Sequence, residues 1–473
     1  MKKIVNSVFV KLTISICSLS MTGVVRAQVV SLEECVEMAM AANKQIKTAE
    51  HQVNQYEHTQ KSVYAKYFPN ISLTAADVYS TLNGHAIMDI ATPVGNYTGQ
   101  QVQNLLPLVV NDALRRQISQ DVTQAVTPLN PEVGYKMKNV LSANITLEQP
   151  IYTGGKLSTA NRIGKLGVKI ATQAQKLARE QIIIEVYEAY QLLVKAKEME
   201  VVAHKYDSLL TQVEHDVKSA VRHGMASHND EMKVAVKKSD AELKIRQAEN
   251  GIRLARMNLC QLIGKPLDSI IEPLPHHDND FVGVVDRNAS VTNRTEYYML
   301  ELNTQMANEK INMEKSAYMP QLGLLLNAGM LDGMELLNSK LFRHKFNMSV
   351  GAILRIPIFN GNETKHKVAT AKEIFMQEQL RQQELADKMK LDLQQQANEV
   401  DEAKLELQLR KRNLEQCEEH LRISRNAYSV GMETLSDLLT AQVMWQEAYA
   451  ELVESRYQAK VKMMKWRKAA GRI

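Results

Sequence analysis

Hydrophobic and polar positions follow two different periods along this chain. In long tracts the apolar residues return every three or four positions, a spacing that places them on one face of an α-helix. Ile183, Val186, Tyr190 and Leu193 show this spacing. In shorter segments apolar and polar residues alternate, which is typical of a β-strand with one apolar face. The pattern therefore predicts a fold that is mainly α, with a small β part.

Two helical tracts are unusually long. No proline interrupts the chain between Gly154 and Gly224, or between Gly361 and Gly431. At 1.5 Å per residue, a helix over either tract would be roughly 100 Å long. A glycine ends each tract, and a second helix is expected to return from it. Small residues flank the apolar stripe of the last helix, which predicts contacts with neighbouring helices on two sides, as in a wall of helices. That stripe consists of Leu435, Leu438, Trp445, Tyr449 and Leu452.

Four segments alternate with period two. They are residues 71–76, 142–148, 321–330 and 347–356. In the last of them Met348, Val350, Ala352, Leu354 and Ile356 alternate with Asn347, Ser349, Gly351, Ile353 and Arg355. We expect strands of about ten residues, apolar on one face and polar on the other, that form two β-hairpins.

The landmarks of the chain occur twice. Gln149-Pro150-Ile151-Tyr152-Thr153-Gly154 corresponds to Ile356-Pro357-Ile358-Phe359-Asn360-Gly361 at an offset of 207 residues. Tyr67-Phe68-Pro69 corresponds to Tyr318-Met319-Pro320 at an offset of 251. A constant offset over long stretches indicates a duplicated architecture. Each copy would comprise a helix, a β-hairpin and a long helical hairpin.

Prolines and glycines mark where one period changes to the other. Pro69 and Pro320 are predicted to lead from helix into strand, because the residue before a proline avoids the α-helical region. Pro150 with Gly154, and Pro357 with Gly361, are predicted to lead from strand into the long helix.

The change of offset places 44 additional residues in the first copy. We expect them in a long exposed loop at 82–135. The first repeat would then cover residues 28–270, an irregular linker or belt segment residues 271–293, and the second repeat residues 294–473. Pro266, Pro273 and Pro275 break the helical pattern around this linker.

Residues 1–27 have the features of a cleaved signal peptide. Lys2, Lys3 and Lys11 form a basic start, an apolar stretch follows, and Val25-Arg26-Ala27 fits a cleavage site. A membrane anchor is the alternative, but the apolar stretch is too short to span a bilayer. Ile16 is too large for the position before a lipidated Cys17.

Charge and cysteine content narrow the possible functions. Without residues 1–27 the chain has 54 basic and 53 acidic residues, so nothing favours nucleic acid as a partner. Three cysteines remain without residues 1–27, namely Cys35, Cys260 and Cys417, and they are too few for a disulfide framework and too far apart for a metal knuckle. No motif of a catalytic or cofactor site is present. His276-His277-Asp278 could bind a metal, although a solvated loop explains these residues better.

Four strands with an apolar face pose a physical problem. They are too few to close a membrane barrel, for which eight is the smallest number in a single chain, and an open sheet in lipid would leave unpaired edges. Three copies would supply twelve strands. We therefore predict a homotrimer that forms one 12-stranded β-barrel.

The sequence resembles the TolC family of outer membrane efflux proteins. The duplicated strand-to-helix junctions at Pro150 and Pro357 carry the resemblance, together with Tyr428-Ser429-Val430-Gly431 and the following Asp437-Leu438-Leu439. It implies a β-barrel in the bacterial outer membrane, continued by a long α-helical barrel across the periplasm. It also implies two partners, a periplasmic adaptor (membrane fusion) protein and an inner-membrane transporter, and no enzymatic chemistry or cofactor.

The glycine turns at Gly224 and Gly431 would be the periplasmic hairpin tips. Ser227 with Asp230, and Thr434 with Asp437, fit the spacing of a helix capping box. The resemblance adds a second interpretation, in which Asp437 lines the constricted entrance and three copies form an anionic ring that favours cations. The two interpretations are compatible.

Two residues depart from the family pattern. Glu433 stands where a basic residue pairs with the acid that here is Asp230, so a salt-bridge latch is not expected. Thr440 replaces a second acid, which weakens the predicted ring. We therefore predict a gate that closes by packing more than by ion pairs.

The sequence thus predicts a passive export channel of a tripartite efflux or type I secretion system. The alternative is a periplasmic coiled-coil structural or adaptor protein without a pore. The exported substrate, whether drug, metal, siderophore or protein, does not follow from these patterns.

Overall fold

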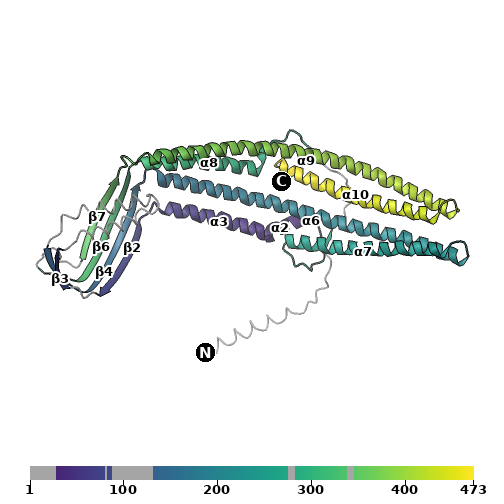
Figure 1. Cartoon of the computed structure of the whole chain (residues 1–473), viewed down its shortest axis with the longest axis horizontal. Coiled ribbons are helices and arrows are strands. Elements are labelled where there is room, and N and C mark those ends of the chain that lie inside the picture. Colours follow the sequence, from purple (N-terminus) through teal and green to yellow (C-terminus); the bar gives the residue numbers. More distant parts are fainter. Residues whose placement is uncertain (1–27, 80–82, 88–131, 275–282, 338–345) are drawn as a thin grey trace, which may run out of the picture. The chain divides into compact units, whose positions relative to one another are not determined.

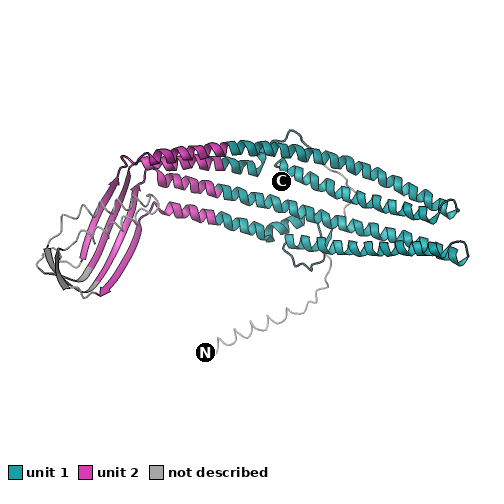
Figure 2. Ribbon diagram, viewed as in Figure 1, with its two compact units in different colours: residues 1–54, 169–302, 380–473 teal, residues 55–168, 303–379 magenta. Residues whose placement is uncertain are grey.

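The computed structural model describes residues 28–79, 83–87, 132–274, 283–337 and 346–473. The predicted signal peptide, most of the predicted loop at 82–135, and His276-His277-Asp278 lie outside these ranges. The chain divides into two compact units (Figure 2). Unit 1 comprises residues 1–54, 169–302 and 380–473, and unit 2 comprises residues 55–168 and 303–379.

Long helices dominate the described chain and confirm the prediction of a mainly α fold (Figure 1). The two longest helices have 67 residues each, and the two that return from them have 35 each. The helices are α2 (Leu32–Ala42), α3 (Lys44–Ala65), α6 (Lys156–Arg222), α7 (His228–Leu262), α8 (Thr295–Lys315), α9 (Glu363–Ser429) and α10 (Leu435–Ala469), with 3-10 turns η2 (Val291–Asn293) and η3 (Ser316–Tyr318). None of the described helices is long and apolar enough to cross a membrane.

The strands of unit 2 form one antiparallel sheet in the order β2-β4-β6-β7, with β3 paired to β4. Strands β4 and β6 have 21 and 17 residues, so the predicted length of ten is wrong for both. Pairing along their whole length lets them extend past the period-two segments, and β3 and β4 occupy both ends of the predicted loop at 82–135. These strands are β2 (Asn70–Tyr79), β3 (Asn83–Ile87), β4 (Glu132–Tyr152), β6 (Gln321–Leu337) and β7 (Phe346–Arg355).

The register of this sheet gathers apolar residues on one face. Leu73 lies opposite Ile145, which lies opposite Ala328, which lies opposite Met348. The neighbouring row on the other face is Ser72, Thr146, Asn327 and Ser349. Leu73 and Met348 are 69% and 63% exposed, whereas Thr146 is buried. In strand β4 the apolar Ile145 is exposed and the polar Thr146 is buried, the reverse of a sheet in a water-soluble protein, whereas both faces of the edge strands β2 and β7 are exposed.

Both edges of the sheet are open among the described residues. Strand β2 pairs with β4 alone, and β7 pairs with β6 alone. An edge strand presents a row of backbone N–H and C=O groups that can pair with another chain.

The junction prolines lie close to their predicted places. Pro69 precedes β2 and Pro320 precedes β6, each directly before the first strand residue, and Pro357 follows β7. Pro150 differs, because it lies inside β4 opposite Gly323, and the register shifts between Pro150 and Tyr152. A proline is tolerated in a strand where such an irregularity removes the need for its missing N–H.

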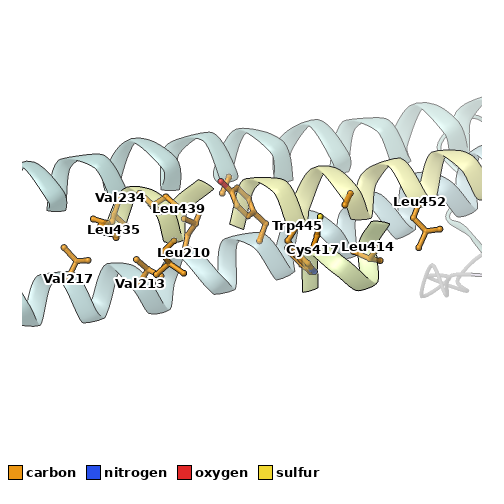
Figure 3. Close-up of a cluster of buried hydrophobic side chains, with 14 of the residues drawn as sticks. Leu210, Val213, Val217, Val234, Leu414, Cys417, Leu435, Leu439, Trp445 and Leu452 are labelled. Carbon is orange, nitrogen blue, oxygen red and sulfur yellow. The ribbon is translucent and has the colours of Figure 1, made fainter. Parts of the chain in front are cut away.

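Unit 1 is held together by a buried cluster that draws on α6, α7, α9 and α10 (Figure 3). Leu210 and Val213 come from α6, Leu414 from α9, and Leu439 and Trp445 from α10. A second cluster includes the buried Cys35 and Cys260. Beside it, the short strands β1 (Gln28–Val30) and β5 (Ile271–Pro273) pair in parallel.

Candidate functional site at the helical hairpin tips

Each long helix ends at a glycine in the left-handed region. Gly224 has a φ of 70° and Gly431 a φ of 77°. The N–H of the following residue reaches back over the turn, from Met225 to the Ala220 carbonyl and from Met432 to the Ala427 carbonyl, at 2.9 Å in both cases. These hydrogen bonds satisfy carbonyl groups at the helix end. The left-handed backbone conformation that the turn requires is one that glycine adopts without strain.

Both tips continue into a capping box, which confirms the structural interpretation of the two acids. In the first tip, the Ser227 hydroxyl accepts from the Asp230 N–H at 3.2 Å, and the Asp230 carboxylate accepts from the Ser227 N–H at 3.3 Å. In the second, the corresponding Thr434 and Asp437 distances are 3.3 and 3.1 Å. The hydroxyl also donates to the carboxylate, at 2.7 Å from Ser227 and 2.6 Å from Thr434. Each carboxylate is thereby held at the start of the returning helix.

The charges around the two acids differ. Lys233 donates to Asp230 at 2.9 Å, and this bond is the main cause that lowers the pKa of Asp230, followed by the Ser227 hydroxyl. The pKa of Asp437 is lowered by the Thr434 hydroxyl first and by the Thr434 N–H second. Among the ion pairs of the described residues, none involves Asp437. Its carboxylate is exposed and keeps its full negative charge.

Thr440 explains this difference, since it occupies the place that Lys233 has in the first tip. Its hydroxyl donates to the Ser436 carbonyl one turn earlier, at 2.8 Å, and so turns back to its own helix. A threonine that bonds to the backbone in this way offers nothing to the neighbouring carboxylate.

Glu433 is bound within its own hairpin. The hydroxyl of Ser424, a buried residue near the end of α9, donates to the Glu433 carboxylate. This contact joins α9 to the turn before α10. It supplies a local role for Glu433 that needs no partner on the first tip.

The two tips lie at the same end of unit 1 (Figure 2). Val217 and Val234 of the first hairpin and Leu435 of the second belong to one buried cluster, and Figure 3 shows the three side chains close to one another. Tyr428 packs against that cluster. Burial raises its pKa, and the negative charge of Asp230 raises it further, which places the two hairpins within electrostatic reach.

Lys233 and Ser424 were missed in the sequence. The Asp230–Lys233 spacing of three residues on a helix is a readable signal for an ion pair. Ser424 gave no such signal, because its contact with Glu433 depends on how the chain folds back across the turn.

No other kind of site is evident in the described part of the chain. No three His, Cys, Asp or Glu side chains are grouped there in a way that could hold a metal ion. Cys35, Cys260 and Cys417 are free and buried, as predicted for apolar fillers.

Residues 291–472 match the family model described as outer membrane efflux protein. The predicted resemblance to the TolC family of outer membrane efflux proteins is confirmed. No curated protein matches the chain.

Solved structures of TolC-like proteins share the fold. The CusC structure is 12% identical, with a TM-score of 0.73 over 96% of this chain and 95% of that one. VceC from Vibrio cholerae is 14% identical, with a TM-score of 0.69 over 93% and 96%. The open-state MtrE outer membrane channel from Neisseria gonorrhoeae is 15% identical, with a TM-score of 0.69 over 96% and 93%. The structural similarity shows that the fold is shared. At such low sequence identity it does not show the function, which has to be argued from the chain itself.

Proposed function

We propose that this chain is the outer membrane channel of a tripartite efflux or type I secretion system. It would conduct substrates passively, with no enzymatic step. The observation that carries the proposal is the β2-β4-β6-β7 sheet, which exposes a row of apolar residues that includes Leu73, Ile145 and Met348, and whose two edges are open among the described residues. Lipid would cover the apolar face, and pairing with further copies would close the edges.

Three copies of this sheet would form a 12-stranded barrel, so the proposed assembly is a homotrimer. The polar row of Ser72, Thr146, Asn327 and Ser349 would then face a water-filled lumen. The helices α6 and α9, at roughly 100 Å each, are long enough to continue such a barrel far into the periplasm. The MtrE structure is likewise named an outer membrane channel.

The remaining parts of the proposal concern location and partners. The mature chain would begin after Ala27, with repeats at 28–270 and 294–473 joined by the belt segment 271–293. It would reside in the bacterial outer membrane, in contact with its lipid, and extend into the periplasm. A periplasmic adaptor protein and an inner-membrane transporter would complete the system.

At the tips, Asp437 from three copies would form an anionic ring at the periplasmic entrance. Its lowered pKa keeps the carboxylate ionised at neutral pH. Asp230 would contribute less, because Lys233 already neutralises it. Glu433 and Thr440 bond within their own hairpin, so closure of the gate would depend on tip packing by residues such as Leu438.

Single-channel conductance of the purified mature protein in a planar lipid bilayer tests the channel. We expect a stable conductance that prefers cations. Asp437→Asn should reduce the cation preference and the block by divalent cations several-fold, whereas Asp230→Asn should change both less.

Two outcomes separate the parts of this proposal. An unchanged selectivity in Asp437→Asn would contradict the ring and leave the channel standing. Silence from folded trimers, in both the parent protein and a Leu438→Ala variant with loosened tips, would contradict the channel. The result would then favour the alternative, a periplasmic coiled-coil protein without a pore.

A further inference from the structure

Helices α6 and α7 line a cavity of about 700 Å³, together with one residue of α10. All of its lining residues belong to unit 1. A volume of roughly 300–1,000 Å³ and a mainly apolar lining are typical of sites for small organic ligands. The proposed channel function makes no use of this space, which we call the α6–α7 cavity.

Small side chains on both helices leave room for the cavity. Ala196 and Ala203 line it from α6, and Ala248, Gly251 and Ala255 line it from α7. A Cβ built on Gly251 would meet no heavy atom within 4 Å, so the space reaches the backbone of α7. A glycine in the middle of a helix weakens that helix, and helix stability therefore does not explain this residue.

The equivalent positions of the second repeat carry larger side chains. At the offset of 207 residues, Ala203 corresponds to Arg410 and Gly251 corresponds to Gln458. Arg410 of α9 pairs with Glu451 of α10, with 2.5 Å between the guanidinium nitrogen and the carboxylate oxygen. The two hairpins have helices of equal length and the same caps, so the small residues are a property of the first repeat alone.

The first repeat also lacks the ion pair that the second repeat has there. Lys244 takes the place of Glu451, and an alanine takes the place of Arg410. Lys244 is half-buried and lines the cavity. Its ammonium group donates to the Gln446 amide oxygen and lies 5.3 Å from the centre of the Tyr206 ring. Among the ion pairs of the described residues, none involves Lys244, although a half-buried charge normally has a counter-charge.

The polar residues that line the cavity include two lysines and no acid. Lys195 is the second lysine. It lies 4.9 Å from the centre of the Tyr457 ring and pairs with Glu454, which does not line the cavity. The charge of Lys195 is thus balanced, whereas the charge of Lys244 is not. The other polar lining residues are uncharged, namely Gln247, Asn258 and Gln446. The cavity therefore combines a mainly apolar wall with one unbalanced positive charge.

Burial differs between the floor of the cavity and its rim. Val202, Ala203 and Ala255 are buried, whereas Leu254 is 67% exposed. An apolar chain that lies in the cavity would cover Leu254 and remove water from the apolar wall, which is the main favourable contribution to such binding. An anionic end group would pair with Lys244, whereas a cationic one would meet a like charge.

We propose that the α6–α7 cavity binds a long-chain carboxylate. The hydrocarbon chain lies against the apolar wall, and the carboxylate accepts from the Lys244 ammonium group. A lysine has three N–H donors, and the bond to Gln446 leaves two for the ligand. A hydrogen bond between two charged groups is stronger than one between neutral groups. The inference does not depend on the proposed channel, because one chain supplies all of the lining residues.

Photoaffinity labelling tests this site. The purified protein, in an uncharged detergent, is irradiated with a diazirine-bearing dodecanoic acid, and the labelled peptides are mapped by mass spectrometry. We expect label in the segments 192–203 of α6 and 244–258 of α7, and unlabelled dodecanoic acid should compete for it. A diazirine-bearing dodecylamine has the same chain and the opposite charge, and it should label these segments at least several-fold less.

Two variants separate the space from the charge. Gly251→Gln introduces the residue of the second repeat into the cavity and should reduce the label from the acid several-fold. It should fold, because glutamine favours a helix more than glycine does. Lys244→Gln leaves the space but removes the charge, and it should bring the acid down to the level of the amine. Arg253→Gln is the control, because Arg253 is an exposed cation of α7 that does not line the cavity, and its labelling should equal that of the parent.

Three results would overturn this proposal. The first is equal labelling of the two segments in the parent, Gly251→Gln and Lys244→Gln, and the second is equal labelling of the parent by the acid and the amine. The third is an unlabelled cavity in the parent together with fewer trimers in Gly251→Gln, which would show that a second copy of the chain covers this face. Conductance enters none of these measurements, so the proposed channel stands or fails separately.

Discussion

The returning helices α7 and α10 have the same length and the same capping box, but they differ in burial. Both have 35 residues. Helix α10 buries apolar residues along its whole length, including Leu438, Leu452 and Trp466. Helix α7 exposes large apolar side chains over much of its length, namely Met232, Val236, Leu243 and Leu254.

The neighbours of each helix account for this difference. Helix α10 packs against α9 and also contacts α6, where Lys465 pairs with Glu188 and Lys468 donates to Gln181. Helix α7 packs against α6 and touches α10 through Lys244 and Gln446. Beside α6 and α7 lies a cavity of about 700 Å³ with a largely apolar lining. Helix α10, which lies between two neighbouring helices, buries its apolar side chains. Helix α7 has the same length but lies at the edge of the unit, and one of its apolar faces stays exposed.

The largest expected effect compares equivalent apolar positions of the two helices, one buried and one exposed. Leu439, labelled in Figure 3, is 6% exposed, and its equivalent Met232 is 44% exposed. Leu439→Ala should destabilise the protein by about 2–5 kcal/mol, because it leaves a cavity. Met232→Ala should cost less than about 1 kcal/mol. Thermal unfolding followed by circular dichroism measures both.

Equal losses in these two variants would break the comparison. They would mean that the exposed face of α7 is covered in the assembled protein, as α10 is covered within one chain. Repeating the measurement on variants that fail to trimerise would locate that cover.

An intermediate effect concerns the two caps, which have the same geometry. Ser227→Ala and Thr434→Ala should each cost about 1 kcal/mol, because each leaves a helix N–H without its acceptor. Hydrogen exchange at the tips measures the local loss. Recovery in Ser227→Thr and Thr434→Ser, which keep the hydroxyl, would assign the loss to the cap. A loss in one tip only would show that the caps are not equivalent.

The caps also predict a pH dependence. The pKa of each acid is lowered in the folded protein. The stabilisation by the ionised carboxylate is therefore complete above the unfolded pKa of about 3.9, and it is lost as the pH falls through the folded value. High salt should weaken the stabilisation of the first cap that comes from the ion pair of Lys233 with Asp230. It should change the stabilisation of the second cap by Asp437 less. Tip exchange at pH 6 and pH 3, at low and high salt, measures both. A cap at Asp437 that responds to salt as strongly as the one at Asp230 would contradict this assignment.

The smallest expected effect comes from exchanging the charge partner. Thr440→Lys copies Lys233 and should stabilise the second tip only slightly, since exposed ion pairs contribute little. Its effect on conductance should be larger, with a reduced cation preference. Lys233→Thr is the reciprocal variant. If the cation preference of the channel is unchanged in Thr440→Lys, Asp437 does not face the permeating ions.

Local elements followed from the sequence because they depend on local properties. The period of Ile183, Val186 and Tyr190 predicted α6, since an apolar face at helical spacing requires no knowledge of its partner. The turns at Gly224 and Gly431 were predictable because left-handed backbone favours glycine. The spacing from Thr434 to Asp437 predicted a cap, because its two bonds close within four residues.

Lengths and partners across the sheet were not predictable in the same way. Strand β4 extends to Glu132 because β3 and β6 pair with it there, in a region where the sequence loses its alternation. Pro150 lies within that strand, because a register shift beside it removes the usual conflict.

The sequence by itself thus determined the duplicated order of helices, strands, caps and turns, because periodicity, glycine, proline and capping hydroxyls act within a few residues of chain. Only the tertiary structure decided that α10 is buried while α7 keeps an exposed apolar face, and that Ser424 donates to Glu433. Those outcomes depend on which elements lie side by side, and residues far apart in the chain decide that jointly.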